Sequence, residues 1–445
     1  MTDLPLTDAA PAASAAPTPI SFHTSAAAQA RLRRRYAAER RFKAYGVAAI
    51  SVAVAMLAWL LFTILQNGFG AFWRTELRLE VTLEAAKIDP EGTGDPARFD
   101  RGAYQELVHE ALYKLFPDAS GRAERRDLRG LVSPVAGAVV APVVAADPSL
   151  VGRTVVVGVP ASDAVSQLAK GNVDRDAPAA SRPLNDRQIA WYDSLVERDA
   201  AVTVFNRTFF TGSDSNYPEL AGIRGALVGS LYAMLVTLVL ALPIGVAAAI
   251  YLEEFAPKNR LTDLIEVNIN NLAAVPSIVF GLLGLAVFLN FFGMPRSVPL
   301  VGGIVLALLV LSTIIIAARA ALKAVPPSIR EAALGMGASR LQTVMHHVLP
   351  LAMPGIMTGT IIAMAHALGE TAPLLMIGMN AFVTEPPSGL LDSAAALPVQ
   401  VYIWADKPER GFQELTSAAI LVLLVFLILM NGTAIWLRRK FERRW

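Results

Sequence analysis

The sequence predicts an α-helical polytopic membrane protein with six transmembrane helices and a mixed α/β domain between the first two. The 445-residue chain is 54% hydrophobic and 17% charged, with a mean hydropathy of +0.47, which is typical of such proteins. Its apolar residues form six runs, each close to the about 20 residues that a spanning helix needs. A net charge of +2 gives no sign of nucleic-acid binding. The absence of cysteine excludes disulfides and thiolate chemistry.

The first 66 residues divide into a polar tail and an apolar run. Residues 1–46 are predicted to be a disordered basic tail, because Ala, Pro, Thr and Ser dominate its start and seven Lys and Arg residues follow. The run 47–66 is interpreted as a retained membrane helix. A cleaved signal peptide is the alternative, which the length of the run and the lack of a small-residue cleavage site disfavour.

Residues 68–220 have a different composition, which predicts the mixed α/β domain. LRLEVTL alternates apolar and polar residues as a strand does, and RTVVVGV and AAVTVF are predicted to be further strands. YQELVHEALYKLF has helical apolar spacing, and RQIAWYDSLVERD is predicted to be a second helix. A segment of about 150 residues can bury its own core. It contains no recognisable catalytic constellation.

Five more apolar runs lie within a membrane region that covers 222–437 and precedes a basic tail, 438–445. The runs are 226–251, 271–292, 299–319, 351–379 and 416–436. If the N-terminus lies inside, the inner segments hold seventeen Lys and Arg residues and the outer short loops hold three. Because basic residues accumulate on the cytoplasmic side, both termini are predicted to be cytoplasmic and the α/β domain extracytoplasmic.

A polar segment between two of these runs, 326–350, predicts two short amphipathic helices on the cytoplasmic side. Each helix starts with a capping-box pattern, Ser328-x-x-Glu331 and then Ser339-x-x-Gln342. Two glycines between the helices predict a stop, and a proline predicts the end of the segment; these are Gly335, Gly337 and Pro350.

Apolar residues recur at helical spacing in both predicted helices of the segment. They are Ile329, Ala332, Ala333 and Met336 in the first, and Leu341, Val344, Met345 and Val348 in the second. One interpretation is that these faces pack against the membrane region of the same chain. The other is that they fill a groove in a partner protein, where the small residues would permit close approach.

The stretch EAALGMGASRLQTVMHHVLP resembles the EAA loop of binding-protein-dependent ABC importer permeases. The matching residues are Glu331, Ala332, Ala333, Gly337, Leu349 and Pro350. His347 replaces the isoleucine of that pattern. VPSIVFGLLGL, PGIMTGTII and GETAPLL resemble the PstA permeases of phosphate importers. This resemblance covers about 222–437, and the N-terminal span and outer domain look like an extension found in one branch of the family.

The resemblance implies a permease subunit of a phosphate importer in the bacterial inner membrane, with an EAA loop that couples it to a separate ATPase. The chain has no phosphate-binding loop of the G-x-x-x-x-G-K-[ST] type, so ATP hydrolysis is assigned to a partner, and no cofactor or metal is expected. The implied partners are an ATP-binding subunit dimer, a second, PstC-like permease subunit and an extracytoplasmic phosphate-binding protein. The alternatives are a permease for another oxyanion, such as sulfate or molybdate, and a membrane-anchored receptor.

Glu370 lies inside the fifth apolar run, where a carboxylate is costly and therefore suggests function. His366 is one helical turn before it, and Pro373 predicts a helix break nearby. The carboxylate could accept a proton from phosphate or hold an arginine of the pathway, for which Arg319 is the candidate. Arg319 could instead be a membrane anchor, and Glu370 a structural acid bound to another helix. Glu370, Thr371 and Arg319 are the candidate pathway residues.

Overall fold

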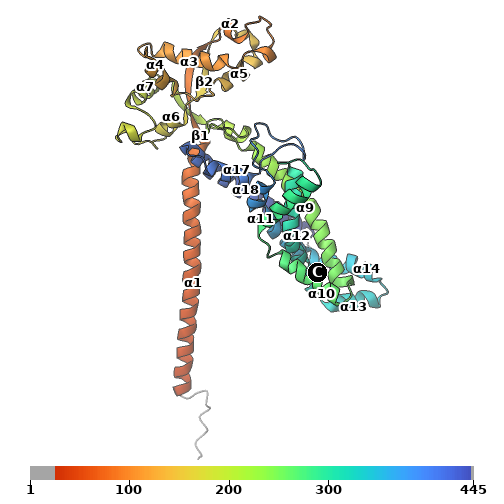
Figure 1. Cartoon of the computed structure of the whole chain (residues 1–445). Helices are drawn as coiled ribbons and strands as arrows, with labels where there is room; N and C mark the ends of the chain where they lie inside the picture. Colours follow the sequence, from red (N-terminus) through yellow and green to blue (C-terminus); the bar gives the residue numbers. More distant parts are fainter. Residues whose placement is uncertain (1–25, 442–445) are drawn as a thin grey trace, which may run out of the picture. The chain divides into compact units, whose positions relative to one another are not determined.

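The computed structural model describes residues 26–441. The chain divides into two compact units, and the boundary in the sequence lies between Thr63 and Ile64. In the described chain, the first unit consists of helix α1 (Ala26–Phe69) as far as Thr63. The second unit contains the rest of the chain, with an α/β region followed by a bundle of long helices (Figure 1).

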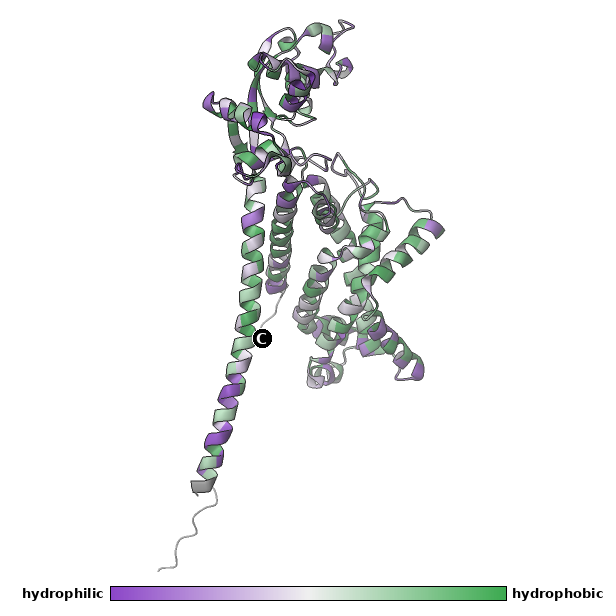
Figure 2. Ribbon diagram, turned by 60° about the vertical axis from the view of Figure 1, so that its left-hand side comes forward, coloured by the Kyte–Doolittle hydropathy of each residue, from purple (hydrophilic) through white to green (hydrophobic). Residues whose placement is uncertain are grey.

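Helix α1 begins 21 residues before the predicted first span. The prediction of a disordered tail is therefore wrong for residues 26–46, and residues 1–25 lie outside the described part of the chain. Ala, Arg, Lys and Glu dominate the extra turns, and these residues favour helices intrinsically. Lys43 and Glu39 also form an i,i+4 ion pair of 2.7 Å. In Figure 2, purple is concentrated at the basic end of α1, and green is the commonest colour in the turns that follow.

Strand β1 (Trp73–Thr82) is the central strand of an antiparallel sheet of order β2-β1-β3, with β2 (Thr154–Pro160) and β3 (Ala201–Phe205) as its neighbours. All three predicted strands are confirmed. One face of β1 carries the predicted apolar row, which continues into the residue after the strand. Its side chains are fully buried, and they are Leu77, Leu79, Val81 and, after the strand, Leu83.

Helices cover this face of the sheet and complete the core. The two predicted helices are confirmed, and α3 and α5 pack against the strands. The helices of the region are α2 (Ala85–Ile88), α3 (Ala103–Leu115), α4 (Arg122–Arg129), α5 (Gly137–Ala146), α6 (Asp163–Ala169), α7 (Asp186–Glu197) and α8 (Arg207–Thr211).

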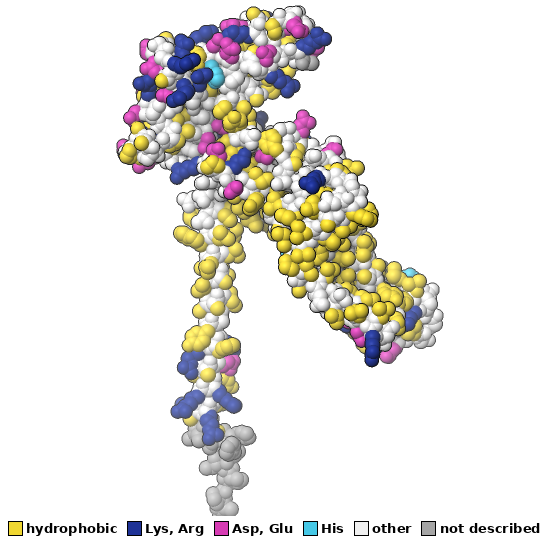
Figure 3. All heavy atoms as spheres, viewed as in Figure 1, with side chains coloured by type: hydrophobic (Ala, Val, Ile, Leu, Met, Phe, Trp, Pro, Cys, Tyr) yellow, Lys and Arg dark blue, Asp and Glu magenta, His cyan; other side chains and the backbone are white. Residues whose placement is uncertain are grey.

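Five helices of the described chain are long and apolar enough to cross a membrane. Besides α1 they are α9 (Arg224–Ile250), α12 (Pro299–Lys323), α15 (Leu349–Gly369) and α18 (Arg410–Phe441). Helix α12 packs against both α9 and α15. The outer surface of this bundle is mostly hydrophobic in the view of Figure 3, as expected of helices that face lipid.

A sixth apolar segment is broken, so the predicted uninterrupted span 271–292 is wrong in detail. Helices α10 (Arg260–Leu272) and α11 (Ser277–Leu283) meet at an angle of 105°, and α11 continues as the π helix Gly284–Phe291. Pro276 lies in the break, where a proline disfavours helical geometry in the residue before it. Residues 26–441 contain six candidate spans if this bent pair counts as one. Two short helices, α16 (Ala372–Met376) and α17 (Leu397–Ala405), complete the bundle.

One apolar cluster contains residues of both the α/β region and the bundle. Phe209 of α8, Trp404 of α17 and Phe412 of α18 are fully buried in the same cluster. Polar contacts accompany it, because the ammonium of Lys170 lies 2.5 Å from the carboxylate of Glu414. The α/β region is therefore joined to the bundle by side-chain contacts as well as by the chain.

Candidate functional site

The first helix of the 326–350 segment, α13 (Pro327–Gly335), begins differently from the prediction. Pro326 is its N-cap, and the Ser328 side chain makes no capping bond, so the first predicted capping box is wrong. Pro327 explains the earlier start, because a proline in the first turn has the required φ and lacks an N–H that would otherwise be unpaired.

The end of α13 confirms the predicted glycine stop. Gly337 has a φ of +86°, a conformation that favours glycine. Its N–H donates to Leu334 O at 2.9 Å, and the next N–H, of Ala338, donates to Ala333 O at 3.1 Å. These two bonds form a Schellman motif. Gly335 is the last residue of the helix and has no such conformation.

The second helix, α14 (Arg340–Thr343), confirms the second capping box. Ser339 Oγ accepts from Gln342 N–H at 3.3 Å, and Gln342 Oε1 accepts from Ser339 N–H at 2.9 Å. The predicted end at Pro350 is wrong, since α14 runs through the π helix η7 (Val344–Val348) directly into α15. Pro350 lies in the first turn of α15, where a proline is tolerated.

Apolar side chains of the segment point both inward and outward. Ala333, Val344 and Val348 are buried against the bundle. Four others are 46 to 80% exposed, and they are Leu334, Met336, Leu341 and Met345. The predicted face of the first helix is thus divided, because Ala333 is buried whereas Ala332 and Met336 are exposed. Packing against the same chain is therefore confirmed for one side of the segment, and docking in a partner's groove stays a prediction for the exposed side. Of the other motif residues, Glu331 is exposed, and Leu349 and Pro350 are half-buried.

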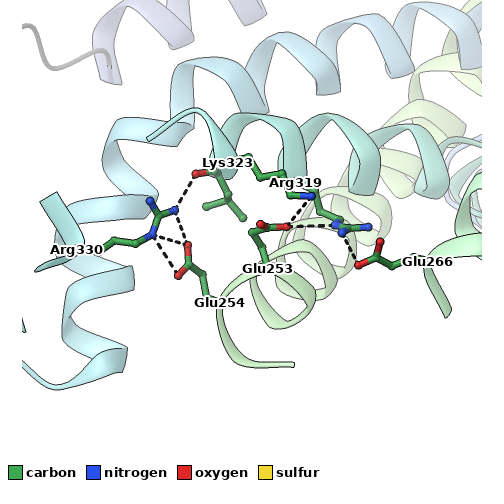
Figure 4. A network of polar contacts seen from close by, with 7 residues as sticks. Glu253, Glu254, Glu266, Arg319, Lys323 and Arg330 are labelled. Carbon is green, nitrogen blue, oxygen red and sulfur yellow. Dashed lines mark hydrogen bonds and ion pairs between the residues drawn. The ribbon is translucent and has the colours of Figure 1, made fainter. Parts of the chain in front are cut away.

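A charged anchor fixes α13 to the bundle (Figure 4). Arg330 contacts Glu254 at the end of α9 with Nη2 at 2.8 Å and Nε at 3.2 Å from Oε1. The same guanidinium donates to the carbonyls of Leu322 (2.9 Å) and Val325 (2.6 Å) where α12 ends. A cation is favourable there, because the C-terminus of a helix carries partial negative charge.

A second part of the network surrounds Arg319 on α12. Its Nη2 lies 2.6 Å from Glu266 of α10 and its Nε 3.6 Å from Glu253, which also lies 3.5 Å from the ammonium of Lys323. The predicted pair between Arg319 and Glu370 is therefore not formed. Two carboxylates already neutralise the arginine, whose side chain is only 14% exposed.

The acidic members of this network are not among the residues predicted from the sequence. Glu253 and Glu254 stand at the end of an apolar run, in the stretch YLEEF. Their negative charge is opposite to that of the basic residues at the neighbouring helix ends. Two adjacent acids at the end of a span could have suggested ion pairs. Their separate partners could not be deduced, because Glu254 and Arg330 are 76 residues apart in the sequence.

Glu370 lies at a break in the bundle, as predicted from Pro373. It is the C-cap of α15, with an extended ψ of 124°, and α16 begins two residues later. His366 Nε2 lies 2.8 Å from Glu370 Oε1, and their side chains are 60% and 15% exposed. The predicted i,i+4 contact is confirmed, and Thr371 is half-buried beside it. Within residues 26–441, no three His, Asp or Glu side chains converge as metal ligands would.

Comparisons with known proteins identify the bundle. Residues 241–445 match the family model described as "Binding-protein-dependent transport system inner membrane component". The Bacillus subtilis protein named "Probable ABC transporter permease protein YqgI" is 30% identical over 52% of this chain and 82% of its own. "Phosphate transport system permease protein PstA 1" of Mycobacterium tuberculosis is 33% identical over 50% of this chain and 72% of its own. The chain belongs to the family of binding-protein-dependent transport system inner membrane components.

Membership of this family makes the chain an ABC transporter permease and a multi-pass inner membrane protein. The resemblance to PstA permeases is confirmed by the named relatives. Residues 29–179, which include most of the α/β region, match a "Domain of unknown function (DUF3333)". A solved structure of the "MetNI methionine ABC transporter" aligns over 50% of this chain and 95% of its own, with 18% identity and a TM-score of 0.38.

Proposed function

We propose that this chain is the permease subunit of an ATP-driven importer for inorganic phosphate. The observation that carries the proposal is the EAA-type segment at one end of the bundle. Its motif residues lie on α13, in the turn after α13 and at the start of α15, and it exposes apolar side chains of both short helices and of the π helix η7. Similar proteins named PstA, from Mycobacterium tuberculosis and Haemophilus influenzae, support the choice of phosphate as substrate.

In this proposal the chain has six spans, with the bent pair α10–α11 as one, and both termini lie in the cytoplasm. The seventeen-to-three distribution of basic residues supports this orientation. It places the α/β region outside, where a phosphate-binding protein would dock. The 326–350 segment then lies inside, within reach of an ATP-binding subunit.

The outward side of that segment is the proposed contact with the ATP-binding subunit. Leu334, Met336, Leu341 and Met345 expose apolar area that a cleft in a partner would bury. Methionines suit such a contact, because their flexible side chains adapt to an irregular surface. The complex would contain an ATP-binding subunit dimer and a second, PstC-like permease subunit, and this chain would not hydrolyse ATP itself.

We assign the translocation pathway to the region of Glu370 and Thr371. The Glu370 carboxylate lies at a helix break inside an apolar run, and among the described residues it pairs only with His366. Burying a carboxylate in a membrane span costs free energy, and a role in transport would explain why it is there. It could hold or transfer a proton as phosphate passes. Arg319 is retained as a pathway candidate only if its pairs with Glu253 and Glu266 open during transport.

Phosphate uptake tests the proposal. A strain that lacks its own high-affinity phosphate permease should regain uptake when it expresses this chain with its partner subunits, and an excess of sulfate or molybdate should not compete. Competition by either anion would favour a permease for that oxyanion. Failure to co-purify with any ATP-binding subunit would favour the receptor alternative.

A further inference from the structure

The π helix η5 (Tyr251–Phe255), which follows α9 directly, contacts the three helices α12, α13 and α14. Glu253 contacts Arg319 and Lys323 of α12, and Glu254 contacts Arg330 of α13. Phe255 lies under the guanidinium of Arg340 of α14, 5.8 Å from its ring centre. Three consecutive side chains thus contact cations on three different helices.

The helical geometry of this turn makes the arrangement possible. Adjacent side chains of a helix do not face the same side, so Glu253 and Glu254 leave the turn in different directions. A π turn of this kind also occurs often at functional sites. Figure 4 shows Glu253 directed toward Arg319 and Lys323, whereas Glu254 is directed toward Arg330.

These contacts join the 326–350 segment to helices that do not adjoin it in the sequence. The 326–350 segment is covalently continuous with α12 before it and with α15 after it. Helices α9 and α10 have no such connection to the segment. The η5 turn connects α9 and α10 to the segment through its side-chain contacts. Four residues after η5, α10 begins, and Glu266 of α10 binds the same Arg319 that lies near Glu253.

The ion pairs of this turn are largely shielded from solvent. The side chains of Glu253, Glu254 and Arg319 are only 11 to 18% exposed. Partly buried, charge-assisted hydrogen bonds of this kind are stronger than surface ion pairs. Moving α13 without α9 would leave the Glu254 carboxylate buried without its cation, which is strongly unfavourable.

We infer that the Glu253–Phe255 turn is the positioning element that carries movement of the 326–350 segment to α9 and α10. This inference rests on the proposed coupling to an ATP-binding subunit. It does not depend on which anion is transported. It assigns to Glu254 and Arg330 a role in coupling that differs from assembly of the complex.

A labelling experiment on the whole transporter complex tests the inference. Since the chain has no cysteine, a single Leu261→Cys on α10, where the native side chain is 65% exposed, can report movement of that helix. The rate of maleimide labelling is measured without nucleotide and with ATP plus vanadate. We expect nucleotide to change the rate in the parent protein and in Lys258→Gln, which removes an exposed charge without an ion pair among the described residues.

Glu254→Gln and Arg330→Gln should each reduce this nucleotide-induced change by about threefold or more, while the ATP-binding subunits still co-purify and hydrolyse ATP. The double variant should be no worse than either single one, because both remove the same contact. A parental response in Glu254→Gln would overturn the inference. Should that variant fail to assemble, Arg330→Gln replaces it, because it removes the same ion pair from the other side, and a parental response there is equally contradictory. A parent complex that shows the response but imports another anion would refute only the phosphate assignment.

Discussion

At the scale of single residues, a substitution of Glu370 distinguishes a role of its charge from a role in packing. Glu370→Gln keeps size and most hydrogen bonding but removes the charge that faces His366. If the charge takes part in transport, phosphate uptake should fall about tenfold or more, the effect of losing a charged hydrogen bond of roughly 1.5 to 3 kcal/mol. The measurement is radiolabelled phosphate uptake with membrane insertion and ATPase co-purification checked.

Glu385→Gln is the matched control for Glu370, because it neutralises an exposed glutamate in the loop after α16. It should leave uptake unchanged. Near-parental uptake in Glu370→Gln would remove Glu370 from the proposed pathway and favour a structural acid.

Glu219, between α8 and α9, predicts a pH-dependent stability. Burial raises the pKa of its carboxyl to about 7, and the nearby Asp163 and Glu409 also raise it. Its Oε1 accepts from Asp163 N–H at 2.8 Å, whereas Oε2 is buried without a partner. The Glu219 carboxyl therefore binds its proton more tightly in the folded state than in the unfolded state. Its contribution to the free energy of unfolding is complete below the unfolded pKa of 4.5 and is lost as pH rises through about 7.

Thermal unfolding in detergent should reveal this titration. Between about pH 5 and about pH 8 the protein should lose on the order of 3 kcal/mol from this group. Glu219→Gln should flatten that part of the pH profile. A variant with the parental pH dependence would show that another group titrates instead.

At the scale of elements, the connection between α13 and α14 depends on the backbone of Gly337. A Cβ at this position would meet no atom within 4 Å, so its positive φ, not crowding within the chain, requires glycine. Gly337→Val should cost about 1 to 3 kcal/mol of local strain and displace α14. We expect normal membrane insertion with lost ATPase association or lost transport-linked hydrolysis.

Gly335→Ala is the matched control for that element. Gly335 is helical, and an added Cβ also meets nothing, so alanine should be neutral or stabilise α13 by up to about 1 kcal/mol. Parental uptake by Gly337→Val would contradict the assigned role of the segment, as would equal loss in both variants.

Glu331 gives a sharper test of partner contact than the sequence suggested. It is exposed and makes no capping bond, so Glu331→Ala should change stability by less than about 0.5 kcal/mol. Reduced affinity for the ATP-binding subunit, measured by co-purification across salt concentrations, would then report a contact with the partner. Unchanged affinity would leave Glu331 without a role in docking.

At the scale of the whole molecule, topology is the first prediction. A periplasmic reporter fused after Asp127 should be active, and the same reporter fused after Ser339 should be inactive. A cytoplasmic reporter should give the opposite pattern. Activity of the periplasmic reporter at Ser339 would overturn both the orientation and the docking proposal.

The shared core decides how the α/β region can be removed. Deleting 75–215 would remove Phe209 from the shared apolar cluster. It would also remove Asp214, whose carboxylate accepts hydrogen bonds from the side chains of Gln400 and Trp404 at 3.0 and 3.1 Å. Such a deletion should therefore destabilise the bundle. Replacing only 78–200 by Asn-Gly should close β1 and β3 as a hairpin, because Leu77 already pairs with Ala201.

The shorter deletion also needs Glu414→Gln, since it removes Lys170 and would leave the buried Glu414 carboxylate unpaired. This protein should insert and keep part of its phosphate uptake. A correctly inserted protein without any uptake would show that the α/β region is obligatory, as expected of an essential dock for the binding protein.

The sequence by itself determined the local structure of this protein. Apolar run length identified its membrane helices, alternation identified β1, and the patterns around Gly337 and Ser339 identified a helix end and a helix start. Each of these features depends on residues a few positions apart, which is why a single sequence contains the signal. The same reasoning placed His366 beside Glu370.

Only the tertiary structure decided which side chains meet across the sequence. Arg319 pairs with Glu253 and Glu266 and not with Glu370, and α14 continues past Pro350. Composition showed that such charges and apolar residues exist, but several partners were compatible with each. Burial and ion pairing depend on distances between helices, and those are fixed by packing of the whole bundle.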